Sequence, residues 1–359
     1  MMFKKKMWIS GICVFCIVIL IGAMGCRPTT AANNVVSSTT TADYSGPDNM
    51  GQWPVFYDIT TGSENYMWFT ESNVNEILRI SPKTGTITDI PTPGIASIDI
   101  TSGPDGNLWF TEWGGNKIGE ISPKTGIVTE YNIPIGDSSP NGITTGPDGN
   151  IWFTEGHQLL AEGDVDSIGK ITPKTGSVTE YNIPTAEAEP TGITAGPDGN
   201  LWFTEGLGNK IGKITPKTGG ITEYAVPTAN AYPMDITAGP DGNLWFTETD
   251  GNSIGKISPK TGVITEYILP TADTQPNGIT AGPDGNLWFT ELNGNKIGKI
   301  VPKTGDVTEY NIPSPNASPS SPFAITIGTD GNLWFTEVGY DVGKISPKTG
   351  KIIEYPVTN

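Results

Sequence analysis

Apolar and polar positions recur in a fixed order along most of this chain. The best-defined copy, residues 192–227, predicts four strands at 192–195, 200–205, 210–215 and 221–226, with tight turns at 196–199 and 216–219. The second strand is apolar on both faces, which is typical of a strand with sheets packed on either side. The fourth alternates polar and apolar residues, as an outer strand half in water does. The repeat unit is therefore predicted to be a four-stranded antiparallel sheet.

The Trp-Phe-Thr-Glu core of that unit occurs seven times. Its tryptophans are 41 to 50 residues apart, at Trp68, Trp109, Trp152, Trp202, Trp245, Trp288 and Trp334. This is the period of a propeller blade, so we expect an all-β, seven-bladed β-propeller with four antiparallel strands per blade over residues 54–359. Each repeat holds its own four strands. The first and last blades should therefore meet by side-chain packing alone, without a strand from residues 44–53.

Strand direction sorts the repeated charges onto two faces. Because antiparallel strands reverse at every turn, the loops between second and third strands share one face, here called the loop face, with the connections between blades. The glutamates that end the seven second strands should lie at it: Glu71, Glu112, Glu155, Glu205, Glu248, Glu291 and Glu337. The lysines of the Pro-Lys-Thr-Gly turns should lie at the opposite turn face. A glutamate present in every blade is expected to cap or cross-link its own blade.

The first 26 residues have the pattern of an export signal. Lys4, Lys5 and Lys6 precede an apolar run over 7–24. Ala23-Met-Gly25-Cys26 resembles a bacterial lipobox, which predicts lipidation of Cys26 and a lipid anchor in the cell membrane. Ordinary signal-peptidase cleavage, giving a secreted protein, and an uncleaved anchor are the alternatives. All three predict an extracytoplasmic propeller, held on a flexible Thr/Ser/Asn-rich tether over 27–53.

Charge and cysteine content narrow the function further. The formal net charge is −17, which argues against a nucleic-acid partner. Two of the three cysteines, Cys13 and Cys16, lie inside the apolar signal, so we expect neither a disulfide nor a redox or zinc motif in the mature protein. The composition is consistent with a monomer whose loop face takes an unknown small molecule or extracytoplasmic partner.

The amino-acid sequence of the repeat also resembles that of a known family. Ile-Thr-x-Gly-Pro-Asp-Gly-Asn-Leu-Trp-Phe-Thr-Glu, followed by Asn-Lys-Ile-Gly-x-Ile and Thr-Glu-Tyr, is similar to the streptogramin B (virginiamycin B) lyase family across all seven repeats. The resemblance implies a seven-bladed propeller that opens a cyclic depsipeptide antibiotic by elimination. It also implies a histidine as the base and a Mg²⁺ ion that polarises the ester.

The chain departs from that family at the catalytic positions. Family members have Pro-His-x-Ile-Thr in one blade and Glu-Pro-His-x-Ile-Thr in the next, whereas Asn141 and Thr191 replace the two histidines here. Glu189 and Glu205 match the family's carboxylates and are the implied ligands of a weak Mg²⁺ site. Neither Asn nor Thr titrates near neutral pH. With Asn141, Glu189 and Thr191 on the binding face, we expect a binding or scaffold protein. The alternative is a Mg²⁺-dependent carbon–oxygen lyase.

Two further sets of residues have both functional and structural interpretations. His157, the sole histidine, lies in an insertion between Trp152 and Trp202 and could supply a displaced base or be a solvated loop residue. Asp58, Asp99 and Asp235 precede Ile-Thr in three inner strands. They are expected at the central channel, where they could cap strand N–H groups or attract a cation.

Overall fold

The computed structural model describes residues 55–94, 96–136, 138–156, 166–313, 321–338 and 341–357. The described residues form 28 strands and one short 3₁₀ turn, η2 (Ser63–Asn65). We number the blades 1 to 7 in chain order. Blades 1 to 4 comprise β1 (Phe56–Thr61), β2 (Met67–Glu71), β3 (Glu76–Ile80), β4 (Ile87–Pro91); β5 (Ser97–Ser102), β6 (Leu108–Glu112), β7 (Lys117–Ile121), β8 (Val128–Asn132); β9 (Pro140–Thr145), β10 (Ile151–Glu155), β11 (Ser167–Thr172), β12 (Ser177–Asn182); β13 (Pro190–Ala195), β14 (Leu201–Glu205), β15 (Lys210–Ile214), β16 (Ile221–Ala225). Blades 5 to 7 comprise β17 (Pro233–Ala238), β18 (Leu244–Glu248), β19 (Ser253–Ile257), β20 (Ile264–Ile268); β21 (Pro276–Ala281), β22 (Leu287–Glu291), β23 (Lys296–Ile300), β24 (Val307–Asn311); β25 (Pro322–Ile327), β26 (Leu333–Glu337), β27 (Asp341–Ile345), β28 (Ile352–Pro356).

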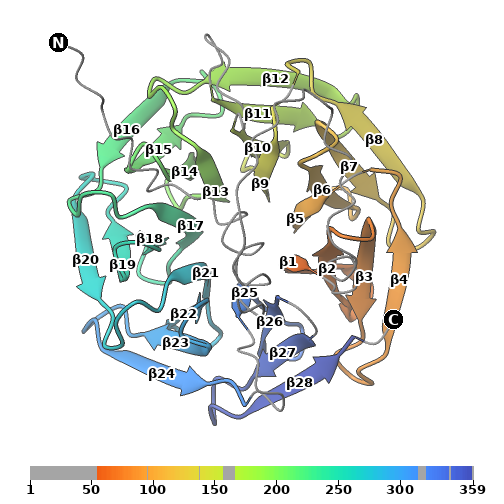
Figure 1. Cartoon of the computed structure of the whole chain (residues 1–359). Helices are drawn as coiled ribbons and strands as arrows, with labels where there is room; N and C mark the ends of the chain where they lie inside the picture. Colours follow the sequence, from red (N-terminus) through yellow and green to blue (C-terminus); the bar gives the residue numbers. More distant parts are fainter. Residues whose placement is uncertain are drawn as a thin grey trace, which may run out of the picture. The chain divides into compact units, whose positions relative to one another are not determined.

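The strands form seven four-stranded antiparallel sheets, each with its strands in chain order. Figure 1 shows these sheets around a central axis, with β1, β5, β9, β13, β17, β21 and β25 innermost and the fourth strands at the rim. The all-β, seven-bladed prediction is confirmed.

The hydrophobic core lies between neighbouring blades. All five residues of every second strand are buried, and the seven repeat tryptophans are 0% exposed. Trp202 of blade 4, for example, packs with Leu244 and Phe246 of blade 5. In blades 2 to 7 a fourth-strand tyrosine stacks on the tryptophan with ring centroids 5.3 to 5.6 Å apart. The pattern of a doubly buried strand in the sequence thus reflects packing against both adjacent sheets.

The ring closes between blade 7 and blade 1 without a shared strand among the described residues. Phe56, Phe69, Trp334 and Val342 share one buried cluster across the junction. The Thr336 hydroxyl also donates to the carbonyl of Tyr57 at 3.1 Å, so the contact includes a hydrogen bond besides apolar packing. The signal, the tether and residues 44–53 lie outside the described residues. In the part of the chain that is described, no helix has the length and apolarity needed to cross a membrane.

Candidate functional site

The candidate binding residues lie on the inner strands of blades 3 and 4, at a β-bulge. In blade 4 the register moves from Pro190 opposite Glu205 to Ile193 opposite Phe203, so one extra residue is inserted in β13. The amide of Gly192 donates to the Thr204 hydroxyl at 2.9 Å. Blade 3 repeats the bulge in β9, around Asn141. The same register shift occurs between the first and second strands of all seven blades, so the bulge belongs to the repeat and not to the candidate site alone.

The two positions that replace the family's histidines differ in exposure. Asn141 is half-buried, and its carbonyl accepts a 2.7 Å hydrogen bond from the Thr111 hydroxyl of blade 2. Thr191 is only 3% exposed. Its hydroxyl donates to the carbonyl of Met234 in blade 5 at 2.6 Å and lies 2.8 Å from the Thr204 hydroxyl. Of this pair, only Asn141 therefore presents its side chain to solvent.

Glu189 precedes β13 in a left-handed backbone conformation, with φ of 49°. Its amide donates to Asp166 Oδ2 at 2.8 Å, and its carbonyl accepts from Gly206 at 3.0 Å. Five other blades have the same conformation at this position, at Ala96, Ser139, Tyr232, Gln275 and Ser321. The backbone geometry thus belongs to the repeat, whereas the half-buried carboxylate is particular to Glu189.

Glu205 ends β14 opposite Pro190, the residue that follows Glu189, and is 0% exposed. No described residue makes a hydrogen bond of good geometry to either carboxylate oxygen. Burial raises the pKa of Glu205 to about 7. The charge of Glu223 adds to this shift, while Lys210 and the nearby Thr185 hydroxyl oppose it. The structure therefore brings the backbones of Glu189 and Glu205 together, but encloses the Glu205 carboxyl within its blade.

These geometries can be compared with known proteins. The model of the Virginiamycin B lyase family matches residues 41–160 and 156–359. The chain belongs to the virginiamycin B lyase family. A solved streptogramin B lyase is 41% identical, with a TM-score of 0.71, over 80% of this chain and 93% of that one.

A second related structure is a catalytically inactive histidine-to-alanine variant of virginiamycin B lyase from Staphylococcus aureus with quinupristin. It is 38% identical, with a TM-score of 0.73, over 86% of this chain and 97% of that one. The extracellular domain of a putative one-component system from B. thetaiotaomicron is 15% identical, with a TM-score of 0.64, over 84% of this chain and 42% of that one, and shares the fold alone. No curated protein matches the chain.

All seven repeat glutamates share the burial of Glu205. Each is 0 or 1% exposed, so the second strands end at these glutamates as predicted, but the glutamate side chains are buried within the blade. In blades 3 and 5 the buried glutamate side chain lies against a third-strand glycine, Gly169 or Gly255. In blade 5, a Cβ added to Gly255 would lie 2.7 Å from Glu248 Oε1. Burial raises the pKa of Glu155 to about 8 and of Glu71, Glu112, Glu248 and Glu291 to about 7.

The channel aspartates cap backbone groups of the following blade, as one of the two interpretations predicted. Carboxylate oxygens of Asp58, Asp99 and Asp235 accept from the amides of Ile100, Ile143 and Ile279 at 3.0, 2.8 and 2.8 Å. They join blade 1 to 2, blade 2 to 3 and blade 5 to 6. The seven turn lysines are exposed, as expected: Lys83, Lys124, Lys174, Lys217, Lys260, Lys303 and Lys348.

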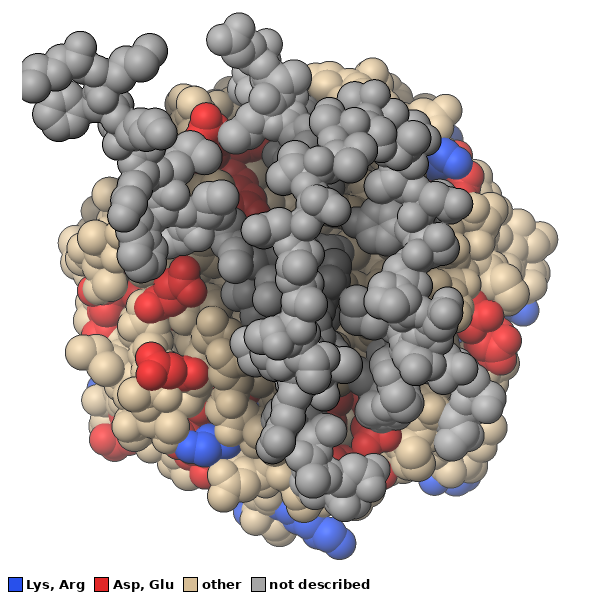
Figure 2. Space-filling model, in the orientation of Figure 1, with Lys and Arg blue, Asp and Glu red and all other residues tan. Residues whose placement is uncertain are grey.

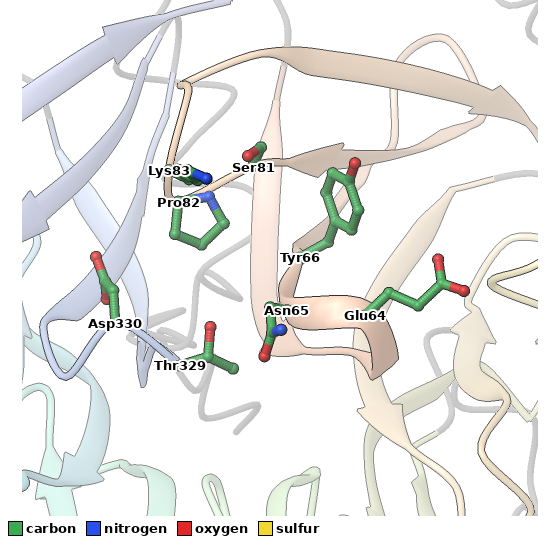
Figure 3. A pocket seen from close by; sticks show the side chains of 8 residues that line it. All are labelled: Glu64, Asn65, Tyr66, Ser81, Pro82, Lys83, Thr329 and Asp330. Carbon is green, nitrogen blue, oxygen red and sulfur yellow. The ribbon is translucent and has the colours of Figure 1, made fainter.

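Neither of the two best-defined cavities contains a candidate residue. The larger, about 610 Å³, lies between blades 7 and 1 and is lined by Glu64, Asn65, Tyr66, Ser81, Pro82, Lys83, Thr329 and Asp330 (Figure 3). The other, about 430 Å³, is the equivalent groove between blades 3 and 4. Both are on the turn face. His157 and Cys26 lie outside the described residues, so their candidate roles stay predictions.

Sequence reasoning missed one acidic cluster. Carboxylate oxygens of Glu337, Asp341 and Glu354 in blade 7 all lie within 4.8 Å of one another. On the described part of the face seen in Figure 2, acidic side chains occur in several separate places and basic ones lie mainly near the rim. The missed signal was Asp341, because three other blades have lysine at that position.

Proposed function

We propose that this protein is an exported binding protein of the virginiamycin B lyase family that does not open its ligand's ring. The observation that carries the proposal is the state of the two histidine positions. Asn141 and Thr191 offer no base near neutral pH, and the Thr191 hydroxyl is engaged with Met234 and Thr204. Binding without chemistry is the function that this geometry supports best.

The related Staphylococcus aureus structure supports separating binding from turnover. That enzyme is inactive after the change of one histidine to alanine, and yet the structure contains quinupristin. The present chain lacks histidine at both matching positions while it retains Glu189. A streptogramin B is therefore the first ligand class to test. We further propose that a lipid on Cys26 tethers the protein, as a monomer, outside the cytoplasm.

We expect the purified protein not to linearise a streptogramin B faster than its Glu189→Ala variant. Without a base to remove the proton beside the carbonyl, elimination loses a rate factor of about 10²–10⁴. Chromatography coupled to mass spectrometry measures the product, because a ring opened by elimination has the mass of the parent but a different retention time. Calorimetry with the intact antibiotic measures binding in parallel. Ready turnover that disappears in Glu189→Ala would contradict the binding function.

A second function, a Mg²⁺-dependent carbon–oxygen lyase that uses His157, is favoured by family membership and by the retained Glu189 and Glu205. His157→Ala in the same assay separates the two functions. Loss of turnover in this variant would identify His157 as the base. If the wild-type protein shows no turnover, the lyase function is excluded.

A weak Mg²⁺ site is the remaining part of the proposal. No described residue makes a hydrogen bond to the carboxylate oxygens of Glu205, but its enclosure fits a hydrated ion only if the side chain turns toward the loop face. Mg²⁺ retains several waters when two carboxylates bind it. When bound, the ion would polarise an ester carbonyl.

Calorimetric titration with Mg²⁺ is expected to show millimolar binding that weakens in Glu189→Gln and Glu205→Gln. Glu291→Gln is the matched control. Glu291 lies two blades away from Glu205, is equally buried and has a lysine at the equivalent position. If all four proteins titrate alike, Glu189 and Glu205 are not the ligands.

A further inference from the structure

The turn between the first two strands of blade 1 departs from the turn that the other blades share. Blades 2 to 6 have Gly-Pro-Asp-Gly-Asn there, and blade 7 differs from them only at Thr329, which replaces the proline. Blade 1 has Gly-Ser-Glu-Asn-Tyr instead, over residues 62–66. Blades 7 and 1 are neighbours across the ring closure. The repeat therefore changes on both sides of one junction.

The changed residues line one cavity. The groove of about 610 Å³ between blades 7 and 1 is bordered by residues 64–66 from one turn and by Thr329 from the other. Figure 3 shows Asn65 of blade 1 beside Thr329 of blade 7. In the equivalent groove between blades 3 and 4, Gly199 and Pro147 occupy the places of Asn65 and Thr329. The substitutions therefore add functional groups to a cavity that the repeat itself builds.

The polar side chains of this groove are available to a ligand. Asn65, Lys83 and Thr329 are exposed, and among the described residues none makes a hydrogen bond to any of these three side chains. An amide, an ammonium group and a hydroxyl together supply both donors and acceptors. Gly199 and Pro147 of the equivalent groove offer neither.

Tyr66 adds an aromatic ring to this lining. Its position is asparagine in the six other blades. The residue is half-buried, and the Arg79 guanidinium lies over its ring, 4.8 Å from the ring centre. Pro82 is the other lining residue with a mainly apolar side chain. The groove thus combines an aromatic ring, held by a cation, with a mostly polar wall.

The stability of the turn does not account for Asn65. Its backbone is left-handed, with φ of 62°, and that of Glu64 is too, with φ of 69°. The six other blades have glycine at the position of Asn65, with φ between 73° and 83°. Glycine adopts this conformation more easily than any residue with a side chain. A role of the Asn65 side chain in binding a ligand would explain why it stands there.

We propose that the groove between blades 7 and 1 binds a short saccharide. A sugar ring carries C–H groups on its faces, which pack against an aromatic side chain, and hydroxyl groups at its edge, which donate and accept hydrogen bonds. Tyr66 provides the aromatic surface. Asn65, Lys83 and Thr329 provide the polar partners. The cavity volume also lies within the about 300–1,000 Å³ that is usual for small-ligand sites.

Other classes of ligand fit this groove less well. An apolar ligand would cover polar side chains without giving them hydrogen-bond partners, which opposes binding. A simple ion would meet charges of both signs, because Lys83, Glu64 and Asp330 all line the cavity. Asn141 and Glu189 belong to blades 3 and 4 and do not line it, so the saccharide site does not rest on the proposed function.

The test is the binding of four disaccharides to the full protein: cellobiose, maltose, lactose and N,N′-diacetylchitobiose. Saturation-transfer NMR and calorimetry should detect at least one of them at millimolar concentration. Tyr66→Ala should weaken that binding about tenfold, because it removes the aromatic surface, and Lys83→Ala should weaken it severalfold. Lys217→Ala is the matched control, because Lys217 has the same place in the groove between blades 3 and 4, and it should leave the affinity unchanged.

A further variant separates binding from folding. Four substitutions together give blade 1 the turn of blades 2 to 6: Ser63→Pro, Glu64→Asp, Asn65→Gly and Tyr66→Asn. This variant should lose disaccharide binding but keep the Tm of wild type, because that turn already forms in five blades of the same frame. Glu189→Ala should keep the wild-type affinity for the disaccharide, whatever it does to antibiotic binding.

Three results would overturn the saccharide site. The first is a four-residue variant that binds the disaccharide as tightly as wild type, since the ligand would then lie elsewhere. The second is a wild type that binds none of the four disaccharides. The third is a wild type that binds tri-alanine in this groove in preference to every disaccharide, which would make the ligand a peptide.

Discussion

Replacing Asn141 and Thr191 together by histidine is expected to give the protein measurable ring-opening activity toward a streptogramin B. Under the proposed function, both positions correspond to the family's histidines, and Glu189 and Glu205 are already present. A positioned base accelerates proton abstraction by about 10²–10⁴, so the double variant should exceed wild type by at least the lower figure. The rate of product formation by chromatography and mass spectrometry measures the gain.

The controls follow from the neighbouring blades. Met234 in blade 5 occupies the position that Thr191 has in blade 4, so Met234→His adds a histidine at the equivalent bulge one blade away and should add no activity. Thr191→His alone must also displace the hydrogen bonds to Met234 and Thr204, which costs about 1–3 kcal/mol of stability if their partners stay unpaired. An inactive double variant that folds and binds the antibiotic would show that more than the two histidines has been lost.

The fold was predictable because every repeat contains the same strand and turn residues and the same buried tryptophan. Contacts between blades were not predictable in the same way. The burial of Thr191 depends on the carbonyl of Met234, 43 residues further along the chain. The glutamates were placed at the correct strand ends, but the sequence did not predict that their side chains are buried. Strand alternation carries no information on either feature.

The candidate site was predictable only in its backbone. The sequence placed Glu189 and Glu205 in one blade, and their backbones are close in the structure: Pro190 pairs with Glu205, and the Gly206 amide donates to the Glu189 carbonyl at 3.0 Å. It could not predict that Glu205 and Glu291 have equivalent surroundings, in which a lysine, a threonine and a second glutamate of the same kind affect the pKa of each. The sequence shows that Glu76 and Asp341 are acids at a position that is lysine in three other blades. It does not show that each of them lies beside a buried glutamate.

Glu291→Gln is expected to stabilise the protein relative to wild type more at pH 8 than at pH 4.5 and below. Burial holds the pKa of Glu291 at about 7 in the folded protein, against an ordinary value of 4.5. Well below pH 4.5 the Glu291 carboxyl is protonated in both states, so this group costs the wild type no stability. As pH rises from 4.5 to 7, the Glu291 carboxyl ionises in the unfolded chain but stays protonated in the folded protein, so the free energy of unfolding falls. The loss is complete above about pH 7.

A shift of this size corresponds to about 3 kcal/mol at most, and side-chain relaxation should reduce it to about 1–2 kcal/mol. Glutamine has nearly the same volume and no charge at any of these pH values, so the variant lacks this one contribution to the pH dependence. Any constant cost of burying the amide cancels when the two pH profiles are subtracted. Denaturant unfolding of both proteins between pH 4.5 and 8 measures the difference. The exposed Glu64, changed to Gln, is the control and should leave the profile unchanged. Parallel profiles for wild type and Glu291→Gln would mean that the buried carboxyl keeps its charge compensated in the folded protein, and that the raised pKa is wrong.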